Sequence, residues 1–142
     1  MIDEYELQDE WAYELRDDLK SFDTIYSSHV FHPIALNGMT VINIYTNFLN
    51  HLNDSIGMCL VPGDEPYLTD DGWNYEEATY IGSTLHDLFQ NRMSNPNIKL
   101  EGDELRLYLN KDEGGNVNQL VSRINEFAEG IQEIFNVEKG RM

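Results

Sequence analysis

The chain has 142 residues, of which 41% are hydrophobic, and this combination indicates one domain with a packed core rather than a disordered chain. It carries 26 acidic residues against 9 Lys and Arg, which gives a formal net charge of −17. Residues 21–91 contain neither Lys nor Arg. Because phosphate recognition relies on these cations, direct binding to nucleic acid or to an anionic membrane is disfavoured, and the expected partner is a basic protein surface.

Three sequence features indicate where the protein resides. No apolar run approaches the roughly 18 residues that a membrane span needs. The first ten residues, MIDEYELQDE, lack the basic and apolar regions of a signal peptide. The single cysteine, Cys59, has no second cysteine to pair with in the chain, as is common for proteins of a reducing compartment. We therefore expect a soluble, cytoplasmic protein.

The first segment of the chain predicts an acidic helix. Over residues 3–20, Leu7, Trp11, Leu15 and Leu19 recur at every fourth position and form one apolar stripe, which is the period of an amphipathic helix. Eight acids and two bases accompany this stripe. We expect this N-terminal helix to present its carboxylates to a partner.

The next segments predict antiparallel strands. Two runs rich in β-branched and aromatic residues flank Asn37-Gly38, a strong hairpin signal because both residues adopt positive φ readily. Residues 47–54 indicate a connector or a short helical turn. A continuous apolar run then indicates a central buried strand, followed by a short strand that pairs back on it. The predicted strands are residues 25–36, 40–46, 55–61 and 67–69.

The second half of the chain predicts helices on both sides of a further hairpin. Residues 74–93 have a helical pattern in one or two pieces, with Gly82 as the break. Residues 98–109 alternate between apolar and polar on both sides of a central Gly-Asp pair, which predicts a hairpin. Residues 117–134 carry apolar side chains at steps of three and four, which predicts a long helix.

These elements together predict an α+β fold. Hairpin connections favour an antiparallel sheet, which we expect to pack against the N-terminal, middle and long C-terminal helices. No internal repeat or linker is evident in the sequence. We therefore expect residues 1–142 to form a single domain, in which an acidic helix over residues 1–22 precedes an α+β core over residues 25–136.

The stretch EPYLTDDGWNYEE, residues 65–77, combines carboxylates with aromatic residues. Asp71-Gly72 is typical of a tight turn. Asn74 is a candidate N-cap, and Glu77 three residues later completes a spacing like that of a capping box. A second interpretation is that Asp54, Asp70 and Asp71 meet at strand ends and bind Mg²⁺, which prefers carboxylate oxygens. The capping interpretation leaves Asp70 on an outward-facing acidic patch.

Other side chains offer little chemistry. His29 and His32 would point to opposite faces of a strand, so they cannot jointly chelate one ion. Cys59 lies in an apolar strand, where a buried thiol behaves as a small hydrophobe with a raised pKa. Trp73, Tyr75 and Tyr80 are expected in the core, because aromatic side chains are usually buried. If exposed beside the acids, they would suit docking into a basic groove.

Three stretches carry a family resemblance: IYTNFLNHLNDSIGMCLV, PYLTDDGWNYEEA, and the last hairpin with its long helix. Over residues 40–136 the chain resembles a bacterial and phage family named domain of unknown function 1828. In that family an Asn-Asp pair, here Asn53-Asp54, precedes an apolar strand, and Leu-Thr-Asp-Asp-Gly, here Leu68 to Gly72, opens a helix. The acidic first 20 residues and the cation-free centre depart from the family pattern.

The resemblance implies no established activity, but it implies a setting in phages and mobile elements, inside a bacterial host. Together with the charge, this setting implies a counter-defence protein like the anti-CRISPR inhibitors that occupy a nucleic-acid-binding surface of a host enzyme. The expected partner is then a basic surface on a Cas nuclease such as Cas9, with the carboxylates acting as mimics of nucleic-acid phosphates.

The sequence therefore predicts a non-catalytic acidic protein, working without a cofactor, that binds and inhibits a nucleic-acid-handling host defence enzyme. Two alternatives remain open. One is a Mg²⁺-dependent phosphohydrolase or nuclease that uses Asp54, Asp70 and Asp71, and the other is a regulatory homo-oligomer that associates through its leucine-stripe helices. The residues expected to contact the basic partner are Asp3, Glu6, Asp9, Glu10, Glu14, Asp17, Asp64, Glu65, Asp70, Asp71, Trp73, Glu76 and Glu77.

Overall fold

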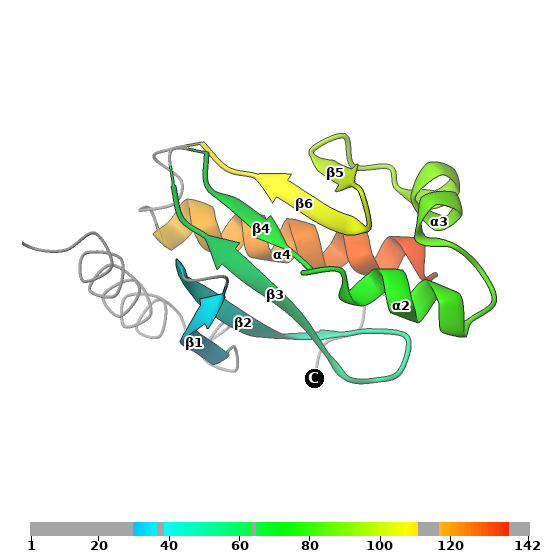
Figure 1. The fold of residues 1–142 in the computed structure, drawn as a ribbon, viewed down its shortest axis with the longest axis horizontal. Coiled ribbons are helices and arrows are strands. Elements are labelled where there is room, and N and C mark those ends of the chain that lie inside the picture. The colour runs from blue at the N-terminus through cyan, green and yellow to red at the C-terminus, as the bar shows by residue number, and fades with distance from the viewer. Residues whose placement is uncertain (1–29, 37–38, 64, 111–116, 137–142) are drawn as a thin grey trace, which may run out of the picture.

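The computed structural model describes residues 30–36, 39–63, 65–110 and 117–136 (Figure 1). Its strands are β1 (Val30–Leu36), β2 (Met39–Leu49), β3 (Ser55–Val61), β4 (Tyr67–Thr69), β5 (Ile98–Glu101) and β6 (Glu104–Tyr108). Its helices are α2 (Trp73–Tyr80), α3 (Leu85–Arg92) and α4 (Val117–Ile134). The predicted N-terminal helix lies outside the described residues.

In the described part of the chain, six strands form one sheet in the order β1-β2-β3-β4-β6-β5. Every neighbouring pair is antiparallel. Figure 1 shows α4 along one face of this sheet, while α2 and α3 lie beyond one end of β4 and β6. The predicted α+β fold with a long C-terminal helix is confirmed.

The core lies between the sheet and α4. The apolar stripe of α4 is buried, as its spacing predicts, and contributes Leu120, Ile124 and Phe127. Ile42 and Ile44 of β2 point into the same core. The alternate residues of β2 and β3 fall on the opposite face, where Val41 and Cys59 belong to a separate small cluster.

The strand β2 is longer than its sequence predicts. Residues 47–49 continue the strand to Leu49, past a bulge between Tyr45 and Leu49, so the expected connector is wrong over these residues. The extension has a packing cause, because Phe48 is buried in the core and the Thr46 hydroxyl donates a hydrogen bond of 2.9 Å to the carbonyl of Ile56 on β3. The predicted strand β3 has the expected bounds.

The region from α2 to β6 follows the sequence pattern closely. The predicted helix is two helices, and Gly82 lies between them with a φ of 78° that favours glycine. Thr84 is the N-cap of α3, since its hydroxyl accepts a hydrogen bond from the Asp87 backbone N–H. The last hairpin forms around Gly102, as expected. None of the helices described here combines the length and the apolar character that crossing a membrane requires.

Candidate binding surface

The stretch over residues 65–77 connects β4 to α2 through a tight turn. Asp71 and Gly72 have φ angles of 52° and 78°, which confirms the turn that this dipeptide predicts. The backbone N–H of Asp71 donates to the Thr69 hydroxyl at 3.0 Å. The turn leaves the Asp71 side chain exposed while the preceding aspartate turns inward.

Asp70 is 5% exposed, and its carboxylate accepts four hydrogen bonds. The donors are the backbone N–H groups of Gly72 (3.1 Å), Asn74 (3.2 Å) and Leu105 (2.9 Å) and the Asn74 side-chain amide (2.9 Å). The backbone N–H groups of Gly72 and Asn74 lie at the start of α2, and that of Leu105 belongs to β6. One carboxylate therefore joins the start of the helix to the sheet.

This arrangement corrects two expectations. The helix begins at Trp73 with Gly72 as the N-cap, and Asn74 is buried within its first turn, so Asn74 is not the cap. The Asp70 side chain performs the capping instead, because its carboxylate accepts from the backbone N–H groups of Gly72 and Asn74 at the start of the helix. Asp70 is also not part of an outward-facing patch. Burial raises the pKa of its carboxyl, while the N–H donors of Leu105, Gly72 and Asn74 favour the ionised form.

Glu77 likewise turns inward, to a histidine of the β2–β3 turn. Its Oε2 lies 3.0 Å from Nε2 of His51, and both side chains are mostly buried. The His51 ring stacks on Phe135 with a centroid separation of 4.5 Å. Glu77 therefore ties α2 to the β2–β3 turn rather than completing a capping box, and its carboxylate is already occupied by His51.

The aromatic residues of α2 are exposed, so the expectation that they lie in the core is wrong. Trp73, Tyr75 and Tyr80 are 43%, 44% and 84% exposed. The cause is the narrow buried stripe of α2, which consists of Asn74 and Ala78. Trp73 and Tyr75 lie one position from this stripe and Tyr80 lies two positions beyond it, so these three side chains point away from the core. The alternative interpretation, aromatic residues exposed beside acids, is the one that the structure shows.

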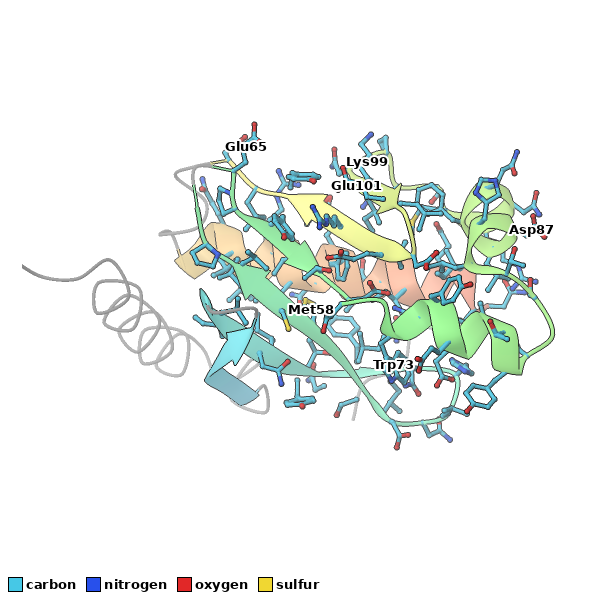
Figure 2. The ribbon with its side chains drawn as sticks, in the orientation of Figure 1. Met58, Glu65, Trp73, Asp87, Lys99 and Glu101 are labelled. Atoms are coloured by element: carbon cyan, nitrogen blue, oxygen red, sulfur yellow. The ribbon has the colours of Figure 1, made fainter. Side chains whose placement is uncertain are left out.

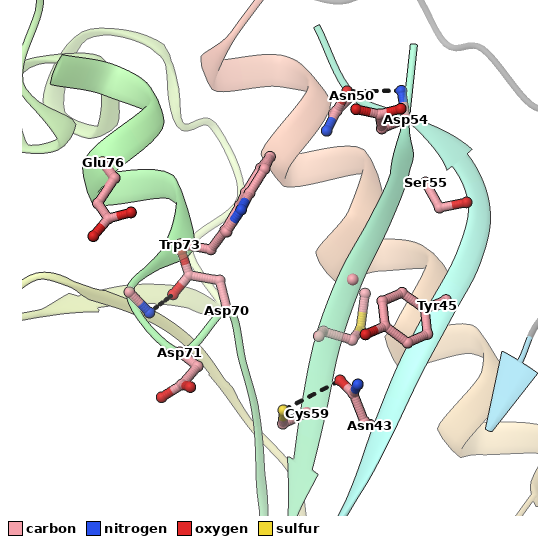
Figure 3. Close-up of a pocket in the computed structure, with 13 residues that line it drawn as sticks. Asn43, Tyr45, Asn50, Asp54, Ser55, Cys59, Asp70, Asp71, Trp73 and Glu76 are labelled. Atoms are coloured by element: carbon pink, nitrogen blue, oxygen red, sulfur yellow. Dashed lines mark hydrogen bonds between the residues drawn. The ribbon is translucent and has the colours of Figure 1, made fainter. Parts of the chain in front are cut away.

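Two adjoining hollows are lined in part by these aromatic side chains. The first, which we call the α2 cleft, has a volume of about 500 Å³ and lies between the start of α2 and strands β2 and β3 (Figure 3). The second has a volume of about 550 Å³ and is lined by Tyr75, Glu76, Thr79 and Tyr80. The α2 cleft is lined by Asn43, Tyr45, Asn50, Asp54, Ser55, Gly57, Met58, Cys59, Asp70, Asp71, Gly72, Trp73 and Glu76.

Exposed acids and rings therefore share one continuous area, since Glu76 borders both hollows. We call this area the acidic–aromatic surface. It consists of Tyr45, Asp54, Asp71, Trp73, Tyr75, Glu76 and Tyr80, each of which is exposed.

Positive charge lies elsewhere in the described structure. The lysine and arginines of this part are Arg92, Lys99, Arg106 and Arg123, on α3, β5, β6 and α4. Arg106 is paired with Glu101 and Glu104, at 3.1 Å each. In Figure 2, Lys99 stands at the β5 edge, well away from Trp73. No cation of the described residues therefore lines the acidic–aromatic surface.

The carboxylates of the α2 cleft do not gather at one point. Asp54, Asp70 and Asp71 all line it, but Figure 3 shows them spread around it. Within the described ranges, no group of three or more His, Cys, Asp or Glu side chains is placed to hold a metal ion. Asp70 already accepts four hydrogen bonds. The geometry thus gives the Mg²⁺-dependent alternative no support.

The thiol of Cys59 behaves as its apolar strand predicts. Cys59 is 7% exposed and lies 3.6 Å from Oδ1 of Asn43. Burial raises its pKa to about 11, and the neighbouring carboxylates of Asp71, Glu104 and Asp70 act in the same direction. A nucleophilic role at neutral pH is therefore disfavoured. His29 and the side chain of His32 lie outside the described residues.

The predicted site residues divide into four groups. Asp71, Trp73 and Glu76 meet at the α2 cleft. Glu65 is exposed, but Figure 2 shows it near the end of β4 that is opposite to Trp73. The side chains of Asp70 and Glu77 are turned inward. Those outside the described residues are Asp3, Glu6, Asp9, Glu10, Glu14, Asp17 and Asp64.

Sequence reasoning missed the places of Tyr45 and Asn50 in the α2 cleft, and it did not include Asp54 among the partner-binding residues. A signal for Tyr45 existed, because it alternates with the core residues Ile42 and Ile44 and so belongs to the opposite face of β2. The Mg²⁺ hypothesis does place Asp54 of the β2–β3 turn near Asp70 and Asp71, and all three line the α2 cleft, but nothing in the sequence pattern places Tyr45 and Asn50 there.

No family model matches the chain, and searches of curated proteins and of solved structures find no match either. The resemblance to domain of unknown function 1828 therefore stays a prediction.

Proposed function

We propose that this protein is a non-catalytic inhibitor in the cytoplasm of a bacterial host, where it binds a basic, nucleic-acid-binding surface of a defence enzyme such as a Cas nuclease. The observation that carries the proposal is the acidic–aromatic surface. Its exposed rings stand among carboxylates with no cation of the described residues beside them.

The composition of this surface favours a protein partner. Exposed Trp and Tyr side chains are the residues that most often dominate binding energy at protein interfaces. The carboxylates around them form no ion pair with a described residue, and they favour a partner rich in Lys and Arg and accelerate its approach. Basic surfaces of this kind are common where enzymes hold nucleic-acid phosphates.

Competition with DNA tests the proposal. A labelled target duplex is bound to a Cas9–guide RNA complex, and fluorescence anisotropy follows its release as this protein is added. We expect release at low salt, with an inhibitory concentration that rises at least about tenfold between about 50 and 200 mM salt, because surface charge attraction is screened. DNA binding unchanged by the protein at every salt concentration contradicts the proposal.

Two matched double variants locate the binding surface. Asp54→Lys with Glu76→Lys reverses two charges inside the acidic–aromatic surface, and we expect it to abolish competition. Glu65→Lys with Asp87→Lys makes the same change in net charge at two exposed sites far from Trp73 (Figure 2), and we expect competition to persist. Equal loss in both variants would mean that net charge alone matters, without this surface.

A further inference from the structure

We propose that the α2 cleft receives an arginine side chain of the partner, with the guanidinium among the exposed rings and carboxylates and a flanking peptide carbonyl on the side-chain amide of Asn50. This inference rests on the proposed function, because it supposes a basic protein partner. It adds the group that the cleft recognises.

Two aromatic rings line the cleft from different elements. Trp73 opens α2 and Tyr45 comes from β2, and the two side chains are 43% and 47% exposed. Both rings are partly exposed where they border the cleft, so a ligand in the cleft can contact them. A guanidinium is planar and weakly hydrated, so it stacks on such faces better than an ammonium group does.

All the charged residues that line the α2 cleft are acidic. Asp54, Asp71 and Glu76 contribute carboxylates from three positions around the cleft, and none of the residues that line it is Lys, Arg or His. Because these carboxylates are spread rather than convergent, they suit a wide cation with several N–H donors. A compact metal ion requires convergent ligands, whereas the five N–H groups of arginine point in several directions.

Asn50 supplies an observation independent of the acids. Its side chain is 2% exposed, and its Oδ1 accepts hydrogen bonds from the backbone N–H groups of Leu52 (2.8 Å) and Asp54 (3.0 Å). Its Nδ2 has no hydrogen-bond partner among the described residues. Figure 3 shows this amide on the side of the β2–β3 turn that faces Trp73.

A buried donor without an acceptor is costly, and native structures rarely keep one. A peptide carbonyl beside the bound arginine would satisfy it. The occupant is therefore a peptide segment rather than an isolated cation.

Gly57 also lines the cleft, beside the Tyr45 ring. Gly57 pairs with Tyr45 across the β2–β3 ladder, and a Cβ at this position would lie 3.5 Å from the Tyr45 ring. The Tyr45 ring therefore lies over Gly57, at a distance where an added Cβ would make an ordinary van der Waals contact. A cleft of about 500 Å³ is within the range that holds a ligand of this size.

The test uses the full chain and two short peptides. The first is acetyl-Gly-Arg-Gly-amide, and the second carries citrulline in place of arginine, which has the same shape without the charge. Nuclear magnetic resonance titration follows the indole N–H of Trp73 and the side-chain amide of Asn50. We expect both signals to shift with the arginine peptide, at a Kd on the order of 1 mM, and the citrulline peptide to bind at least about tenfold more weakly.

Three variants assign the site. We expect Trp73→Ala to weaken binding at least about tenfold and Asp54→Asn about threefold. The control Glu65→Gln removes one charge at an exposed site outside the cleft and should leave the Kd unchanged. Thermal unfolding verifies that each variant is folded.

The outcomes separate this inference from the proposed function. Equal affinity for the citrulline peptide, or arginine binding that survives both Trp73→Ala and Asp54→Asn, overturns the arginine cleft even if competition with DNA holds. Arginine binding in the cleft together with unchanged DNA binding by Cas9 supports the cleft and contradicts the proposed function. No shift of either signal at about 10 mM peptide also overturns the inference.

Discussion

Asp70 and Asp71 are neighbours of the same type with opposite environments. Asp70 is 5% exposed, and its carboxylate accepts hydrogen bonds from four N–H donors. Asp71 is exposed, and its backbone adopts the left-handed conformation with a φ of 52°. The sequence shows that a turn and a helix start here, which the structure confirms. It does not show which carboxylate caps the helix, because the Leu105 N–H that completes the site comes from a strand 35 residues later in the chain.

The difference predicts unequal effects of the same substitution. Asp70→Asn turns an amide N–H₂ toward N–H donors, and we expect a loss of about 2–3 kcal/mol in the free energy of unfolding. Asp71→Asn should change it by less than about 0.5 kcal/mol, because an exposed asparagine tolerates positive φ. Urea unfolding followed by circular dichroism measures both. Equal stability of the two variants would show that the Asp70 hydrogen bonds contribute nothing.

The burial of the Cys59 thiol leads to a second prediction at the residue scale. Burial raises its pKa from 9.0 to about 11, so near pH 8 the thiolate fraction is about a hundredfold lower than in the unfolded chain. We expect a maleimide to react at least about a hundredfold more slowly with the native protein than with the protein in urea, and faster as pH rises toward 11. Equal rates in the two states would contradict the burial.

The raised pKa of Cys59 also makes the stability of the fold depend on pH. The folded state favours the protonated thiol. The contribution of Cys59 to the free energy of unfolding is therefore fully present below pH 9 and declines as pH rises toward about 11. The variant Cys59→Ala should lack this part of the alkaline decline.

At the scale of elements, α2 shows how a short helix with a narrow buried stripe supports a binding surface. It buries only Asn74 and Ala78, and it is fixed by Asp70 at its start and by the Glu77–His51 pair in its second turn. Polar contacts thus position a helix whose rings remain exposed. A longer apolar stripe would have turned those rings into the core.

The helix α4 instead packs very closely on the sheet, and Gly130 permits the approach. A Cβ at Gly130 would lie 2.3 Å from Cδ1 of Ile98 on β5, and Ile98 is 2% exposed. Alanine is about 1 kcal/mol better than glycine within a helix. The overlap with a packed side chain, however, costs about 1–3 kcal/mol.

A double-mutant cycle separates these two effects. We expect Gly130→Ala to destabilise the wild-type protein by about 1 kcal/mol. In the Ile98→Val background, which lacks Cδ1, the same change should stabilise by up to about 1 kcal/mol, because only the helix preference remains. Chemical denaturation of the four proteins gives the coupling energy. Additive effects would mean that α4 and β5 do not meet at this glycine.

At the scale of the whole molecule, the charges are segregated. The acidic–aromatic surface lies in the part of the chain without Lys or Arg, while Arg106 and Arg123 are paired with Glu101, Glu104 and Glu126 on the other part of the fold. The net charge of −17 therefore acts as self-repulsion, which these three arginine–glutamate pairs relieve only in part.

This repulsion predicts stabilisation by salt. Raising sodium chloride from about 20 to 500 mM shortens the range of charge interactions, and we expect the thermal midpoint to rise by several degrees. A control in an uncharged osmolyte at equal osmolality separates screening from general solute effects. A midpoint that falls with salt would show that favourable ion pairs outweigh the repulsion.

The sequence by itself determined the α+β class, the strands from β3 onward, the break at Gly82 and the long helix α4. These features depend on local periodicity and on turn residues, which neighbours in the chain settle. Tertiary structure decided which side of α2 is buried, that Asp70 rather than Asn74 caps it, and that Tyr45 and Asn50 line one cleft with Trp73. These features depend on contacts between segments 20 to 35 residues apart, and local sequence patterns carry no information about such contacts.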